Sequence, residues 1–181
     1  MKHLMVDIET MGTNVDCPII QIGAVYFELS TGKIGKEFLI NIDLKDSMEH
    51  GAVPDGSTIY FWLTQSQEAR DSLLDPKTPF LTEIDGLVQF NEFWQGATEV
   101  WSHATFDFVI LQHAMQRRNI RPWINFREAK DIRTLTFLAG MTKEEVAATK
   151  IVRKGTQHNA LSDALFQVAY CSECYKKIKG L

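Results

Sequence analysis

The β-rich opening of the chain is the feature that most restricts its fold. Residues 4–8 form a short apolar run interrupted by an acid, which is typical of a buried central strand. Residues 18–29 are rich in β-branched and aromatic side chains, and residues 37–42 alternate apolar and polar positions after a turn at 30–33. This pattern predicts a hairpin. We therefore expect three antiparallel strands before residue 43.

The pattern changes after the third strand, where helical and extended segments alternate. The helical segments are 57–63, 65–74, 82–94, 106–118, 133–138 and 159–178, and the short strand candidates are 99–102 and 128–132. A hairpin followed by such alternation predicts an α/β fold with a mixed sheet and helices on both faces. A length of 181 residues without internal repeats or linkers predicts one domain, 1–181.

The composition predicts a globular protein of the cytoplasm. Hydrophobic residues make up 45% of the chain and charged residues 23%. No apolar run approaches the roughly 20 residues that cross a bilayer, and Asp7 follows the first residue too closely for a signal peptide. The three cysteines form no disulfide framework. Cys171 and Cys174 lie late in a helical segment without a second pair to complete a zinc site, so a structural role is expected.

The net charge of −4 argues against a broad surface that coats nucleic acid nonspecifically. It does not exclude a metal-dependent nuclease. Four of the 23 acidic residues are metal-ligand candidates, and the remaining 19 balance the 19 basic residues. Divalent cations at those four carboxylates would offset the excess charge locally.

Asp7 and Glu9 are the strongest functional signal. Residues two apart on a strand share one face, so Ile8 should anchor in the core while both carboxylates project together. Two like charges held close together repel, and burial adds a desolvation cost. A divalent metal is the usual compensation. The alternative is a strand end with two solvated acids.

Asp107, His158 and Asp163 are ambiguous when each is considered alone. Asp107 follows a predicted strand, where it could be an ordinary acid of a first helical turn. His158 precedes the last predicted helix, and a neutral imidazole can accept a proton from water near pH 7. Asp163 lies five residues later, one too many for the same helical face. The histidine should therefore lie on the incoming loop and Asp163 on the helix.

Together these residues resemble the three motifs of the DEDDh family of 3′→5′ exonucleases, which shares a ribonuclease-H-like fold. The motifs are Asp7-Ile8-Glu9-Thr10, His103-Ala104-Thr105-Phe106-Asp107 and His158-Asn159-Ala160-Leu161-Ser162-Asp163. The resemblance extends from position 4 to about 175. The amino-acid sequence of residues 7–14, 57–65 and 130–134 is similar to that of a small bacterial and phage subgroup. This subgroup includes phage exonuclease A and mycobacterial exoribonuclease-like proteins.

The resemblance implies hydrolysis of the terminal phosphodiester by two divalent cations, Mg²⁺ or Mn²⁺, with release of nucleoside 5′-monophosphates. Asp7 is expected to bridge both ions. Glu9 and Asp163 would hold the ion beside the attacking water, and Asp107 would support the other ion through water. His158 would remove the proton of the water without binding a metal.

Substrate contacts are expected around the first motif. Thr10, Met11, Gly12 and Thr13 could cradle the terminal nucleotide, since Gly12 permits close backbone approach. Trp62 could stack on a base or pack in the core. His103, where many DEDDh enzymes have Asn, could contact substrate or be structural. Lys150, Arg153 and Lys154 could attract phosphates or form a solvated charge run.

Two other functions fit parts of the pattern. The first is an endonuclease of the ribonuclease-H-like fold, against which a His-x4-Asp arrangement at the last helix argues. The second is a nucleic-acid-binding module without catalysis, against which the presence of all five active residues argues. The expected partner is a nucleic acid with a free 3′ end, either RNA or DNA. The resemblance also suggests a homodimer.

Overall fold

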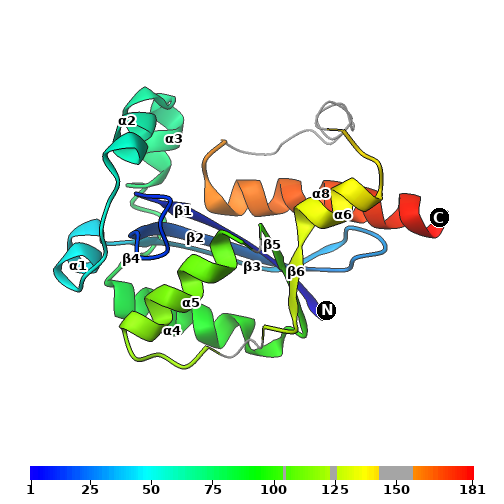
Figure 1. The fold of residues 1–181 in the computed structure, drawn as a ribbon, viewed down its shortest axis with the longest axis horizontal. Coiled ribbons are helices and arrows are strands. Elements are labelled where there is room, and N and C mark those ends of the chain that lie inside the picture. The colour runs from blue at the N-terminus through cyan, green and yellow to red at the C-terminus, as the bar shows by residue number, and fades with distance from the viewer. Residues whose placement is uncertain (104, 123–125, 143–156) are drawn as a thin grey trace.

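The computed structural model describes residues 1–103, 105–122, 126–142 and 157–181. Their centre is a six-stranded mixed sheet in the order β4-β3-β2-β1-β5-β6 (Figure 1). The first three strands are antiparallel, whereas β4 joins β3, β5 joins β1 and β6 joins β5 in parallel. The strands are β1 (His3–Thr10), β2 (Ile19–Phe27), β3 (Ile34–Ile42), β4 (Phe80–Leu81), β5 (Glu99–Ser102) and β6 (Ala129–Asp131). The predicted α/β fold with a mixed sheet is confirmed.

Helices cover both faces of this sheet, as predicted. The helices of the described residues are α1 (Leu44–Glu49), α2 (Gly56–Thr64), α3 (Gln67–Ser72), α4 (Glu83–Phe93), the 3₁₀ turn η1 (Trp94–Gly96), α5 (Asp107–Arg117), α6 (Ile132–Leu138) and α8 (Ala160–Lys179). Several begin at side chains that accept a hydrogen bond from the first turn, such as Asp55 before α2 and Asn159 before α8. Helix α1, strand β4 and η1 were not predicted, because each is too short to show a period.

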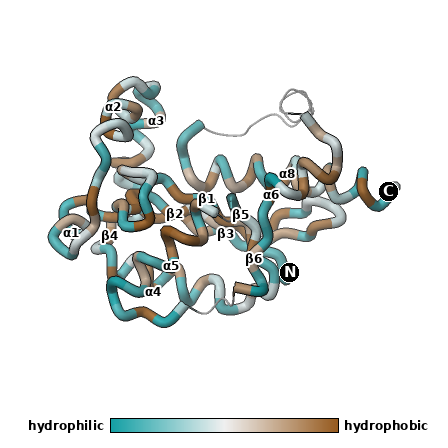
Figure 2. The backbone as a smooth tube through the Cα atoms, in the orientation of Figure 1, coloured by the Kyte–Doolittle hydropathy of each residue, from teal (hydrophilic) through white to brown (hydrophobic). Residues whose placement is uncertain are grey.

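The alternation of side chains along β1 divides the core into two layers. Leu4, Val6 and Ile8 belong to the layer under α4 and α5, whereas Met5 belongs to the layer under α6 and α8. Figure 1 shows the two helix pairs on opposite sides of the sheet, and Figure 2 shows hydrophobic residues along the central strands. Since residues two apart share a face, Asp7 and Glu9 project toward α8.

Helix α8 approaches the sheet unusually closely at its first turn. A Cβ on Gly23 of β2 would lie 2.2 Å from the backbone of both Ala160 and Leu161, so only glycine fits there. The side chain of Gln21, on the same strand, accepts a hydrogen bond from the Ala160 N–H at 2.7 Å. Because Gly23 pairs with Asp7 and Gln21 with Glu9, the start of α8 lies directly beside the two carboxylates.

Two further expectations concern the whole chain. None of the helices in the described ranges is both long and apolar enough to cross a membrane. Cys17, Cys171 and Cys174 are buried and form no disulfide. Burial raises the pKa of Cys171 and of Cys174 above the ordinary value for a thiol, so both are neutral at pH 7. The structural role expected of the C-x-x-C pair agrees with this placement.

Candidate active site

The site forms where β1, β5 and α8 meet. Asp107 begins α5 just beyond the end of β5, and its Oδ1 accepts a hydrogen bond from the Ile8 N–H at 3.1 Å. Its Oδ2 accepts a second bond from the His103 N–H at 3.0 Å. The carboxylate of α5 is thereby tied to the peptide between the two acids of β1. The three sequence motifs, far apart in the chain, converge on one end of the sheet.

Asp107 is buried, with only 2% of its surface exposed. Burial raises its pKa to about 7, against the effect of three backbone N–H groups (Ile8, Asp107 and His103) and of Arg133, which favour the charged form. The folded chain thus keeps a carboxylate in a place that disfavours negative charge. A nearby cation would reverse that preference.

His103 lies beside Asp107, with Nδ1 3.9 Å from Oδ2. Burial, followed by the positive charge of Arg133, lowers the pKa of His103 to about 4. The imidazole is therefore neutral at pH 7. A contact of His103 with substrate would be a hydrogen bond and not an ion pair with phosphate.

Asp7 is held from the opposite side, by α8. The Gln167 Nε2 donates a hydrogen bond of 2.6 Å to Asp7 Oδ1, and both side chains are buried. The Gln167 Oε1 is buried without a hydrogen-bond partner among the described residues. This acceptor and the buried carboxylates together form a polar site that the surrounding protein atoms do not fully satisfy.

Glu9, His158 and Asp163 form the tightest cluster of the site. Each offers one ligand atom, and these atoms all lie within 4.8 Å of one another. Asp7 and Asp107 are outside this group and are engaged by the hydrogen bonds described above. Carboxylate oxygens in such numbers are the ligands that Mg²⁺ and Mn²⁺ prefer. The donor set, with the unsatisfied buried Gln167 acceptor, therefore fits divalent cations.

His158 is positioned by its backbone and by aromatic rings. Its N–H donates to Asp163 Oδ2 at 3.1 Å, and its backbone has a φ of 62°, in the left-handed region. The rings of Phe61 and Trp62 meet the imidazole edge-on, with centroids at 5.1 and 6.0 Å. As the sequence suggested, the histidine lies on the loop before α8 and Asp163 lies on the helix.

A pocket of about 370 Å³ opens beside this cluster. It is lined by Ile8, Glu9, Thr10, Gly12, Thr13, Ser57, Thr58, Phe61, Trp62, Phe106 and His158. The structure therefore brings Thr10, Gly12 and Thr13 together with Glu9 and His158. Gly12 is tightly packed, because a Cβ there would lie 2.6 Å from the Cys17 Cβ.

Met11 is the exception among the expected cradle residues. It lines a separate apolar pocket of about 300 Å³, together with Leu63, Leu73 and other residues, on the far side of Trp62. Its backbone polar groups are also engaged: the N–H donates to Pro18 O at 2.9 Å and the carbonyl accepts from Asp55 N at 2.7 Å. The structure does not bring Met11 into the site.

Of the two roles that the sequence left open, the structure shows Trp62 packed in the protein interior. Only 4% of it is exposed, and its Nε1–H donates to the Thr10 carbonyl at 2.9 Å. The tryptophan thus anchors α2 to the end of β1 and contributes one wall of the pocket. Its neighbour Phe61 is 43% exposed and presents the larger free aromatic surface.

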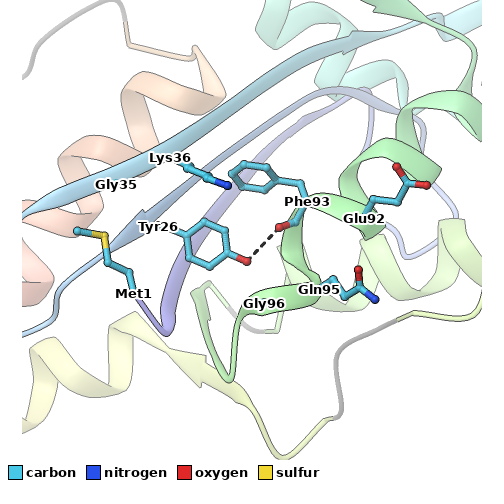
Figure 3. Close-up of a pocket in the computed structure, with 8 residues that line it drawn as sticks. All are labelled: Met1, Tyr26, Gly35, Lys36, Glu92, Phe93, Gln95 and Gly96. Atoms are coloured by element: carbon cyan, nitrogen blue, oxygen red, sulfur yellow. Dashed lines mark hydrogen bonds between the residues drawn. The ribbon is translucent and has the colours of Figure 1, made fainter.

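A larger pocket, of about 660 Å³, lies at the other end of the sheet (Figure 3). Its lining includes Tyr26, whose hydroxyl donates to the Phe93 carbonyl at 3.0 Å, and Lys36. Glu92 is the one carboxylate among its lining residues, so this lining lacks the donor set of a metal site. The smaller pocket beside Glu9 is therefore the candidate active site.

Sequence reasoning overlooked three residues of this region. Gln167 lies one helical turn after Asp163, so it could have been found by following the inward face of the last helix. Phe61 is next to Trp62 in the sequence and was not singled out. Arg133 carries no local signal, and only the tertiary structure brings its charge near His103 and Asp107. Lys150, Arg153, Lys154 and Ala104 lie outside the described residues.

The fold is similar to that of solved exonuclease I structures. Exonuclease I of E. coli in complex with a dT13 oligonucleotide superposes with a TM-score of 0.70 at 14% identity, over 98% of this chain and 42% of that one. The zinc-bound E. coli exonuclease I–ssDNA complex gives 0.67 at 13%, over 94% and 39%. Exonuclease I of Methylocaldum szegediense gives 0.69 at 16%, over 98% and 41%. This chain thus spans about two fifths of these proteins.

A comparison of sequences finds no match among curated proteins. A family model does match, over residues 2–175 of the 181. It covers β1 to α8 and hence all three motifs. The chain belongs to the family described as the 3′-5′ exoribonuclease Rv2179c-like domain.

Proposed function

We propose that this chain is a two-metal-ion 3′→5′ exonuclease that removes nucleoside 5′-monophosphates from single strands with a free 3′-hydroxyl. The observation that carries the proposal is the placement of Glu9 and His158 in the wall of one pocket, with Asp163 within 4.8 Å of both. Metal ligands and a general base thus share a space in which a nucleotide can be seated.

The metal site would be built from Asp7, Glu9, Asp107 and Asp163. When bound, two divalent cations would lower the pKa of the attacking water and neutralise charge on the leaving oxygen. Hard carboxylate oxygens favour Mg²⁺ or Mn²⁺ over zinc. The raised pKa of Asp107 agrees with a carboxylate placed for a cation, since a cation would favour its ionised form.

His158 would act as the general base. Its backbone bond to Asp163 and the two ring contacts from α2 hold the imidazole beside Glu9. A neutral imidazole in this place can accept the proton of a water that attacks the terminal phosphorus. His158 is close enough to the carboxylates to coordinate a metal, but its imidazole is assigned here to proton transfer.

The pocket beside the cluster would seat the terminal nucleotide. Its volume of about 370 Å³ lies within the range of small-ligand sites and suits a single nucleotide. Thr13, Ser57 and Thr58 offer polar contacts, and the exposed Phe61 ring offers an apolar face for a base. These features support a single-stranded end as the substrate.

RNA is the substrate that we favour, because the family is described as one of exoribonucleases. The similar exonuclease I structures contain DNA oligonucleotides, at identities that establish only the fold. Thr13, Ser57 and Thr58 are lining residues whose hydroxyls could bind a ribose 2′-hydroxyl. End-labelled RNA and DNA of one sequence, compared at equal concentration, test this preference.

The first prediction concerns strand ends. A linear single strand with a 3′-hydroxyl should be shortened one nucleotide at a time in Mg²⁺ or Mn²⁺. The same strand with a 3′-phosphate should resist, because the extra negative charge would lie beside Glu9 and Asp163. A closed circle should stay intact. Gel electrophoresis of labelled substrates over time measures all three.

Asp7→Asn is the control for contaminating nuclease, and its rate should fall by orders of magnitude while its circular dichroism spectrum is retained. Opening of the circle as fast as linear degradation, and loss of that opening in Asp163→Asn, would show that the metal site belongs to an endonuclease. Turnover by Asp7→Asn close to that of the wild type would show that the site is wrongly placed.

A further inference from the structure

Gln167 is a buried polar residue among apolar neighbours on α8. Ala164, Val168 and Cys171 of α8 belong to the hydrophobic layer against β1 and β2. Gln167, within this stretch, is only 5% exposed. A leucine or methionine would suit such surroundings, because burial of an amide is costly unless its hydrogen bonds are satisfied. The Gln167 carbonyl Oε1 lacks a partner among the described residues, so packing alone does not account for this side chain.

The other end of the amide makes one short contact, the 2.6 Å bond from Nε2 to Asp7 Oδ1. The last torsion of an aspartate is soft, so an isolated carboxylate plane rotates over a broad range. A hydrogen bond from a buried, helix-borne amide restricts that rotation. It also raises the local preference for the charged carboxylate, since the amide N–H group interacts more strongly with a charged acceptor than with a neutral one.

We propose that Gln167 is a positioning residue, which fixes the Asp7 carboxylate in the orientation that binds the catalytic cation. This inference rests on the proposed metal site. Gln167 and Asp163 are one turn apart on α8, and the same helix is joined to β2 by the bond from Ala160 to Gln21. Hydrogen bonds on either side of Asp163 along α8, from Ala160 and from Gln167, therefore fix the distance between Asp163 and the β1 carboxylates.

A merely structural role makes the opposite prediction about metal affinity. If Gln167 only compensates the charge of Asp7 in the metal-free protein, its loss destabilises the metal-free site and metal binding becomes tighter or stays unchanged. If Gln167 orients Asp7 for the cation, its loss weakens metal binding. Residues in such supporting positions typically change metal affinity 10–100-fold.

The experiment is a titration of the nucleic-acid-free protein with Mn²⁺, followed by isothermal calorimetry. Gln167→Met keeps the length and volume of the side chain and removes both polar groups. We expect its Kd for Mn²⁺ to rise about 10–100-fold. Its exonuclease rate should recover as the Mn²⁺ concentration is raised in proportion to that Kd. Gln167→Asn, which is too short to reach Asp7, should show the same direction and serves if the methionine variant does not fold.

Ser172→Ala is the matched control, because Ser172 is buried on the same helix and its hydroxyl donates to the Leu29 carbonyl at 2.8 Å, away from the site. This variant should lose thermal stability and keep the wild-type Kd for Mn²⁺. A folded Gln167 variant with wild-type or tighter Mn²⁺ binding would overturn the inference and leave the proposed function intact. Absence of Mn²⁺ binding in the wild type would overturn the metal site and this inference with it.

Discussion

At the scale of single residues, Asp107 and His103 respond to pH with opposite signs in the metal-free protein. Burial raises the pKa of Asp107 from 3.8 to about 7, so the folded state binds more protons than the unfolded state in that window. The contribution of Asp107 to the free energy of unfolding therefore falls as pH rises through this window. Burial lowers the pKa of His103 from 6.5 to about 4, so its contribution rises with pH over that window.

Variants at these two positions should separate the two contributions. In EDTA, the urea midpoint of Asp107→Asn should increase more steeply from pH 4.5 to 6.5 than that of the wild type. The reason is that this variant lacks the Asp107 contribution to stability, which falls with pH. The midpoint of His103→Gln should instead decrease over the same range. Equal slopes for all three proteins would show that neither group titrates as described. Saturating Mg²⁺ should remove the pH dependence of stability that Asp107 causes in the wild type, since the cation keeps the carboxylate ionised.

At the scale of elements, the close approach of α8 to β2 decides whether the site assembles. Gly23→Ala would place a Cβ 2.2 Å from the backbone of Ala160 and Leu161. Backbone atoms cannot yield as a flexible side chain does, so the helix start must move away from the strand. We expect a loss of about 1–3 kcal/mol in the free energy of unfolding. The loss in exonuclease rate should be larger than stability explains, because His158 and Asp163 move with the helix.

Gly56→Ala is the matched control for this prediction. It lies in the first turn of α2, and a Cβ there would meet nothing within 4 Å. Its stability should stay equal or rise slightly, because alanine has less conformational freedom to lose on folding. Denaturant titrations and rates at saturating substrate, measured on both variants, test the pair. Wild-type activity in Gly23→Ala would show that α8 need not be so close.

At the scale of the whole molecule, a buried ion-pair network holds the side of the sheet opposite the site. Glu83 at the start of α4 is fully buried and pairs with Arg117, while its second oxygen lies 3.8 Å from Arg118 Nε. The Glu83 N–H donates to Asp46 of α1 at 2.9 Å. Through its side chain and its backbone N–H, Glu83 therefore links α4 to α5 and to α1.

Glu83→Gln should remove the negative partner of two largely buried arginines. Breaking such a pair leaves uncompensated charge, which costs about 3–5 kcal/mol of unfolding free energy. The Kd for Mn²⁺ should not change, since the network lies on the other face of the sheet from Asp7. Lys45→Gln, in an exposed pair with Glu49, should change stability by less than about 1 kcal/mol. Equal effects of the two variants in guanidinium titrations would contradict this ranking.

Some elements could be predicted from local pattern alone. The strand at 99–102 was predicted with its observed bounds, and the last helix within one residue at either end. The side-chain period of that 20-residue helix repeats often enough to be recognised. Strand β4 has only two residues and exists because Asn41 and Ile42 of β3 supply its partners. Two residues are too few for an alternating pattern of apolar and polar side chains to predict a strand.

The sequence by itself determined which residue types were available for chemistry, because an acid–x–acid strand and two later motifs require no knowledge of the packing. The tertiary structure alone decided which neighbours complete the site. Gln167, Phe61 and Arg133 lie near the motif residues through helix packing on the sheet. Met11 was excluded because the chain turns after Thr10 and places that side chain in another pocket. Strand periodicity sets the face of a side chain, but its partners depend on where other elements pack.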